Sequence, residues 1–200
     1  MKVGRSNEWE GQPDGWIRTC RLRNSAPYAR VTDMLRVMLD SCVFDRLLDD
    51  AEVHNKLYYS GVQSGQVAVM TTHIQRDELV ATPDPEKRAN LVSCWDLLTR
   101  TVTTVPTGMF VLGVSRLDQA CLGEDEVFDQ VLRTSAENTK DGLPGHTNDA
   151  LIVHTALVQQ ATLVTLDRKR MMKVARAVGV HTWTIDEFFD RIRRGDFSSG

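Results

Sequence analysis

Four acidic residues of this sequence stand where strands are expected to end or helices to begin. They are Asp40, Glu78, Asp149 and Asp167. In an open parallel sheet, ligands bind outside the carboxyl ends of the strands, so acidic residues at that edge can act together. Bare carboxylates gathered there would repel one another, so the cluster makes physical sense chiefly when a cation occupies it. Because hard oxygen ligands suit Mg²⁺ or Mn²⁺, the pattern predicts a site for these ions.

Each of the four also has a purely structural interpretation when it is taken alone. Asp149 would be a charge that the helix dipole favours in the first turn of its helix. Asp40 and Asp167 would each cap the helix that follows. Glu78 would be a solvated surface carboxylate. The case for chemistry therefore depends on the four residues together.

Short apolar runs alternate with helical patterns along the chain, and these elements must position the carboxylates. The runs predict strands near residues 34–39, 67–70, 102–105, 161–166 and 180–184. Helical spacing follows behind Asp40 and extends over residues 50–59, 74–79, 85–98, 124–138, 148–157, 168–178 and 185–194, with Thr147 or Asn148 as the cap of the helix that holds Asp149. This alternation predicts a three-layer α/β/α domain, with a central, mostly parallel sheet of about five short strands and helices on both faces.

The domain organisation follows from where this alternation starts. Residues 1–33 are rich in Gly, Pro, Arg and Asn and show no sustained period, so we expect a flexible or irregular N-terminal arm. That arm either contacts a partner or has no function. The α/β domain is expected to span residues 34–194, with a C-terminal tail at 195–200.

Composition limits the class of protein. The chain has 200 residues, of which 42% are hydrophobic and 26% charged, as is usual for a soluble globular protein. Its four cysteines are scattered without metal-knuckle spacing, which favours reduced thiols in a cytoplasmic protein. No apolar run is long enough to span a bilayer, so neither membrane insertion nor export is expected.

Charge gives no general support for nucleic-acid binding, because the net charge is −3 and the isoelectric point is near 6.0. A positive contact surface must then be local. Basic residues directly after Asp167, together with one histidine, are candidates for contact with the phosphates of an anionic substrate: Arg168, Lys169, Arg170, Lys173 and His146. The alternatives are a solvated helix face for the basic residues and a structural loop histidine.

Four stretches containing the carboxylates resemble, in order and spacing, the acidic motifs of the PIN-domain family of metal-dependent ribonucleases. They are residues 38–43, 72–79, 148–152 and 163–167, within a resemblance that covers about residues 34–189. Cys42 departs from the pattern, since Asn or Ser is more usual there. Asp77 competes with Glu78 for the second acidic position, and Glu78 is preferred because it lies on one helix face with Ile74.

The resemblance implies a PIN-like fold and cleavage of RNA that leaves a 5′-phosphate on one product. Asp40, Glu78 and Asp149 would be the primary ligands of Mg²⁺ or Mn²⁺, and Asp167 would bind a second ion directly or through water. Ser41 and Thr165 would orient these ligands by hydrogen bonds. Thr165 suits this role because the strand period of two places it on the same face as Asp167.

The resemblance leaves the biological role open. PIN proteins include toxins held by a protein antitoxin, and RNA-processing enzymes; a homodimer is a further expectation. A non-catalytic PIN-like module that binds RNA or protein is the alternative from a different class, although all four acidic positions are retained. An aspartate-nucleophile phosphatase would need a second Asp two residues after Asp40, where this chain has Cys42.

Overall fold

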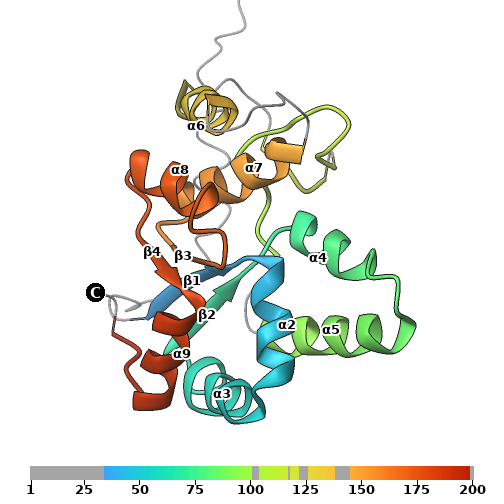
Figure 1. Cartoon of the computed structure of the whole chain (residues 1–200), viewed down its shortest axis with the longest axis vertical. Coiled ribbons are helices and arrows are strands. Elements are labelled where there is room, and N and C mark those ends of the chain that lie inside the picture. The colour runs from blue at the N-terminus through green and yellow to red at the C-terminus, as the bar shows by residue number, and fades with distance from the viewer. Residues whose placement is uncertain (1–33, 101–103, 117, 122–125, 138–144, 199–200) are drawn as a thin grey trace, which may run out of the picture. The chain divides into compact units, whose positions relative to one another are not determined.

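A central sheet of short parallel strands forms the middle of the domain. The computed structural model describes residues 34–100, 104–116, 118–121, 126–137 and 145–198. The strands are β1 (Leu35–Leu39), β2 (Val67–Met70), β3 (Thr162–Thr165) and β4 (Thr182–Thr184). They lie in the order β2-β1-β3-β4, and every neighbouring pair is parallel. The carboxyl ends of β1 and β3 therefore lie side by side (Figure 1).

The expectation of about five strands is corrected to four in the described residues. Of the predicted strand at 102–105, residues 102 and 103 lie outside the described residues, and residues 104 and 105 are not in a strand. The Val105 N–H donates to the Thr71 carbonyl at 2.9 Å, just beyond the end of β2. This bond continues the edge of the sheet without making a ladder.

Helices connect the strands, as the alternation predicts. They are α2 (Ser41–Asp49), α3 (Ala51–Lys56), the π-helical segment η2 (Leu57–Val62), α4 (His73–Val80), α5 (Pro85–Leu98), α6 (Glu126–Glu137), α7 (Gly145–Val158), α8 (Met171–Ala177) and α9 (Ile185–Arg194). The predicted helix at 50–59 is thus two segments, and the one predicted from residue 168 begins three residues later. Within the described residues, no helix is long and apolar enough to cross a membrane.

Two apolar cores, one on each face of the sheet, make the three layers. Side chains alternate along β1: Leu35, Val37 and Leu39 enter one core, and Met38 enters the other. The first core receives side chains from α2, α3, α5 and α9, and the second from α6, α7 and α8. Figure 1 shows these two groups of helices on opposite sides of the strands. The predicted three-layer α/β/α class is therefore confirmed.

The start of α7 differs from the expectation. The helix begins at Gly145, so neither Thr147 nor Asn148 is its cap, and Asp149 is its fifth residue. The first turn contains no acidic residue. The Asn148 side chain instead donates to Glu78 Oε1 on α4, at 3.5 Å. The dipole explanation for Asp149 is weakened, because that effect fades after the first turn.

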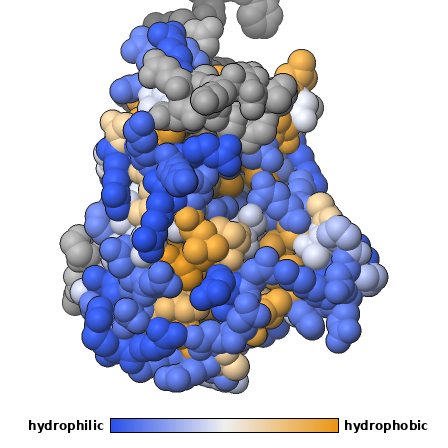
Figure 2. Space-filling model, viewed as in Figure 1, coloured by the Kyte–Doolittle hydropathy of each residue, from blue (hydrophilic) through white to orange (hydrophobic). Residues whose placement is uncertain are grey.

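The exposed large apolar side chains each come from a different segment of the fold. They are Leu48, Tyr59, Val80, Leu112, Val127, Val158 and Leu166. Figure 2 shows a mainly hydrophilic face with a smaller apolar area near its middle. Scattered apolar exposure of this kind is normal for a globular domain.

Candidate active site

Asp40 is held at the junction of β1 and α2 by hydrogen bonds to both carboxylate oxygens. Its Oδ1 accepts the Ser41 N–H at 2.8 Å, so Asp40 also caps α2. Its Oδ2 accepts the hydroxyl of Thr165 at 2.6 Å, and Thr165 is fully buried at the end of β3. The two strand ends are thereby joined through side chains that are 125 residues apart.

Cys42 supplies a further donor to Asp40. Its Sγ lies 3.1 Å from Asp40 Oδ2. Burial, followed by the charge of Asp40, raises the pKa of the Cys42 thiol to about 12. The thiol therefore stays protonated and donates its proton to the carboxylate. Where Asn or Ser would be more usual, this chain keeps a hydrogen-bond donor of another type.

Asp167 follows β3 and organises the turn that leads into α8. Its Oδ1 accepts the backbone N–H groups of Lys169 at 3.1 Å and Arg170 at 2.9 Å. Its Oδ2 accepts from Arg170 Nε at 3.2 Å. Because these bonds shape residues 168–170 as a turn, α8 starts at Met171 rather than at Arg168. The prediction that Asp167 caps this helix is therefore wrong, because the N-cap of α8 is Arg170; Asp167 organises the turn before the helix instead.

The charges of the other three predicted carboxylates all act on Asp149. Its pKa is raised to about 6, first by burial and then by the charge of Asp40, with smaller contributions from Glu78 and Asp167. The positive charge of Arg170 opposes this rise. The fold therefore brings Asp40 after β1, Glu78 on α4 and Asp167 after β3 within electrostatic reach of Asp149 on α7.

Glu78 and its neighbour Asp77 face different partners. Asp77 is ion-paired with Arg116, whose Nη2 lies 2.7 Å and 2.9 Å from the two carboxylate oxygens. Glu78 is exposed, accepts from Asn148 on α7, and acts on the pKa of Asp149. Of the two residues, Glu78 is the one whose charge acts on the pKa of Asp149.

Gln75 is a positioning residue that the sequence patterns did not indicate. It is fully buried on α4. Its Oε1 accepts from the backbone N–H and hydroxyl of Thr72, at 2.7 and 2.5 Å, which completes a capping box. Its Nε2 donates to the Leu39 carbonyl at 3.2 Å, directly before Asp40. Gln75 thus ties the helix of Glu78 to the end of β1. The spacing Thr-x-x-Gln was the available signal.

The predicted RNA-contacting residues are not equivalent in the structure. Arg168 pairs with Asp186 at 3.4 Å, and both side chains are mostly exposed. Lys169 and Lys173 are exposed. Arg170 lies instead against Asp167. The side chain of His146 lies outside the described residues.

The donor set fits Mg²⁺ or Mn²⁺ by its chemistry, because every candidate ligand is a hard carboxylate oxygen. As the described side chains stand, no three or more His, Cys, Asp or Glu residues are close enough to enclose an ion. Both oxygens of Asp40 and of Asp167 accept hydrogen bonds from protein groups instead. Binding of Mg²⁺ or Mn²⁺ would therefore require these carboxylates to move closer together around the ion.

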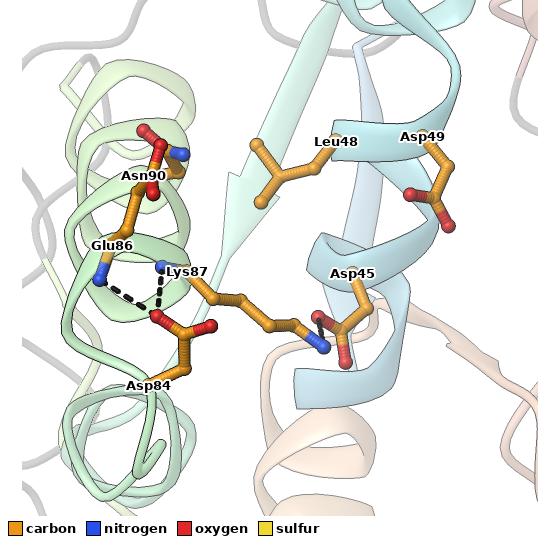
Figure 3. Close-up of a pocket in the computed structure, with 7 residues that line it drawn as sticks. All are labelled: Asp45, Leu48, Asp49, Asp84, Glu86, Lys87 and Asn90. Carbon is orange, nitrogen blue, oxygen red and sulfur yellow. Dashed lines mark hydrogen bonds and ion pairs between the residues drawn. The ribbon is translucent and has the colours of Figure 1, made fainter.

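A second group of carboxylates, between α2 and α5, has structural roles. It lines a cavity of about 530 Å³ with Asp45, Leu48, Asp49, Asp84, Glu86, Lys87 and Asn90 (Figure 3). Asp84 caps α5 by accepting the backbone N–H groups of Glu86 at 2.9 Å and Lys87 at 3.1 Å. The Lys87 ammonium lies 2.9 Å from Asp45. These contacts explain the cluster without a ligand.

No family model and no curated protein sequence matches the chain. Among solved structures, it is similar to VapBC2 from Rickettsia felis bound to a DNA fragment from their promoter, at 18% identity and a TM-score of 0.43, covering 75% of this chain and 98% of that one. It is also similar to FitAcB from Neisseria gonorrhoeae, at 14% identity and a TM-score of 0.35, covering 74% and 97% of the two chains. Both likenesses are distant, so the proposals below depend on the residues of this chain.

Replacing Asp149 by asparagine should stabilise the metal-free protein. A raised pKa means that ionised Asp149 opposes folding, by an amount fully present above about pH 6 and lost as the pH falls through the unfolded value of 3.8. At about pH 7.5 we expect Asp149→Asn to gain roughly 1–3 kcal/mol in denaturant unfolding with a chelator present.

The advantage of Asp149→Asn should shrink as the pH is lowered through about 6. Asp49→Asn is the matched control, because Asp49 is an exposed carboxylate in the other acidic group. Equal stability of Asp149→Asn and the parent across this pH range would contradict the strained charge at Asp149.

Proposed function

We propose that this chain is a Mg²⁺- or Mn²⁺-dependent ribonuclease whose ions are held by the four carboxylates Asp40, Glu78, Asp149 and Asp167. The observation that supports this most is the environment of Asp149, a half-buried carboxylate whose pKa is raised to about 6 by burial and by the charges of the other three. Structural cores avoid such an arrangement, because it costs folding energy unless a cation compensates it. Perturbed groups of this kind are common at functional sites.

Some residues of the site are proposed to bind the ion, and others to orient the residues that bind it. Asp40, Glu78 and Asp149 are proposed as primary ligands, and Asp167 as a ligand directly or through water. Thr165 and Cys42 donate to one oxygen of Asp40, which limits how that carboxylate can turn. When bound, the cation supplies charge neutralisation at the scissile phosphate and a water of lowered pKa for in-line attack.

Substrate binding is proposed to use the exposed basic side chains after β3. Arg168, Lys169 and Lys173 extend from the turn and the first part of α8, beside Asp167. Their charges would attract the phosphates that flank the scissile bond, which a chain of net charge −3 needs locally. RNA is the proposed substrate because the acidic motifs resemble those of PIN-domain ribonucleases.

A protein antitoxin is the proposed partner. A ribonuclease that cleaves many RNAs would damage the RNA of its own cell. A protein that binds near the carboxylates and blocks them would prevent this damage, which fits the proposed activity. In that case the chain would be the toxin of a toxin–antitoxin pair.

The proposal is tested by metal-dependent cleavage of a broad RNA pool. Purified protein should cut RNA with Mn²⁺ or Mg²⁺, lose the activity with a chelator, and regain it when Mn²⁺ is added back. The new ends should carry 5′-phosphates. A parallel purification from cells that lack the protein controls for contaminating nucleases. Cleavage that continues in chelator, or no cleavage above the control, would overturn the proposal.

A further inference from the structure

Arg170 supplies a positive charge from this chain itself to the carboxylate cluster. Its backbone N–H donates to Asp167 Oδ1 at 2.9 Å, and its Nε donates to Asp167 Oδ2 at 3.2 Å. One residue thereby engages both oxygens of a carboxylate that the proposed function assigns to a metal ion. The sequence alone had placed Arg170 with the residues that contact RNA.

Arg170 also lies near a second carboxylate of the cluster. Arg170 and Asp149 line the same small cavity, of about 10 Å³, with Ser135, Val153, Met171 and Val174 around it. The positive charge of Arg170 lowers the pKa of Asp149, against the three carboxylates that raise it. Its guanidinium is thus close enough to stabilise negative charge on both Asp149 and Asp167.

We propose that Arg170 is the built-in counter-cation of the metal-free carboxylate cluster, and that a divalent cation must displace its guanidinium from Asp167 in order to bind. This inference rests on the proposed function, because it assumes that the carboxylates take a metal ion. Arginine suits the task, since its planar donors match carboxylate oxygens and its charge persists at every physiological pH.

The surroundings of Arg170 allow this exchange. Its side chain is 49% exposed, whereas the side chain of Asp167 is 29% exposed. The arginine can therefore move toward solvent and release the carboxylate to the cation. Residues 168–170 form a turn before α8, and the backbone carbonyl of Arg170 accepts from Val174, so the side chain can move while this backbone bond is kept. Arg170 would then set the cation concentration at which the nuclease becomes active.

The inference is tested by Mn²⁺ affinity, measured by calorimetry on the purified full chain without RNA. Arg170→Gln keeps a polar side chain of similar length and removes the charge. We expect it to bind Mn²⁺ about two- to fivefold more tightly than the parent, as the loss of one partly exposed ion pair predicts. In chelator, its melting temperature should fall below that of the parent, and Mn²⁺ should restore it.

Arg168→Gln is the matched control for metal binding. It removes the same charge two residues away, from a side chain that pairs with Asp186 outside the cluster. Its Mn²⁺ affinity should change less than that of Arg170→Gln. Equal affinities in parent and both variants, or weaker binding in Arg170→Gln, would overturn this inference alone. Absence of Mn²⁺ binding in all three proteins would overturn the proposed function and this inference with it.

Discussion

Asp40→Asn should reduce Mn²⁺-dependent cleavage of RNA by at least about 100-fold, because it removes a primary ligand of the proposed ion. The change is nearly isosteric. The remaining carbonyl oxygen can still accept the Ser41 N–H and cap α2. The new amide nitrogen cannot accept from Thr165 or from Cys42, so the ligand loses its charge and both of these orienting bonds.

Rates should be compared by single-turnover cleavage of one labelled RNA, after thermal unfolding has shown that the variant is folded. Asp49→Asn is the control, since it removes an exposed carboxylate from the group between α2 and α5 and should cleave like the parent. Cleavage by Asp40→Asn at the parental rate would show that the carboxylate cluster is not the source of the activity.

Gln75→Ala should destabilise the protein by about 2–4 kcal/mol, the largest stability change that we expect from a single polar side chain in this fold. The Leu39 carbonyl would lose the amide donor at 3.2 Å, and the Thr72 N–H would lose an acceptor at 2.7 Å. All three residues are fully buried, so no water is at hand to replace the missing groups. The truncated side chain would also leave a cavity.

Gln75→Ala should reduce cleavage as well, because Gln75 fixes the start of α4 against the end of β1 and thereby places Glu78 relative to Asp40. Denaturant unfolding measures the first effect. Cleavage at a temperature well below both melting points measures the second. Gln130→Ala is the matched control, since Gln130 is exposed on α6. If Gln75→Ala and the parent had the same midpoint of denaturant unfolding, the Gln75 side chain would not be holding α4 against the end of β1.

Arg170 and the proposed metal ion would meet the same physical need. Carboxylates from four elements share one edge of the sheet, and some positive charge must offset their repulsion. The guanidinium of Arg170, on a short turn, supplies that charge through a partly exposed ion pair and can move away from Asp167. The cost of the site to folding is therefore reduced in the metal-free protein without closing it to a cation.

The alternation of strands and helices was predictable from local pattern. The apolar runs near 34–39, 67–70, 161–166 and 180–184 have the length and period of buried strands, and each contains a strand. Asp40 and Asp167 were recognised because each directly follows such a run. A residue at the end of a parallel strand reaches the ligand-binding edge whatever its neighbours are.

Distant pairing was decided only by the tertiary structure. The family resemblance had implied that Thr165 orients the carboxylates, but its donation to Asp40 depends on β1 and β3 being neighbours in the sheet. The same holds for the assignment of Asp77 to Arg116 and for the link from Gln75 to Leu39. The predicted strand at 102–105 failed for a related reason: β propensity at Val105 does not ensure a partner strand.

The four carboxylates thus have two sources of support. Their order, and the positions of Asp40 and Asp167 after strands, were determined by the sequence itself, through hydrophobic period and strand length. Their mutual electrostatic influence, centred on Asp149, was decided by the packing of α4 and α7 against the sheet edge. The contact of Arg170 with Asp167 adds a role beside its predicted contact with RNA, and it lies in the turn whose backbone N–H groups Asp167 accepts. Local pattern can select the residues, but burial and sheet order decide which charges meet.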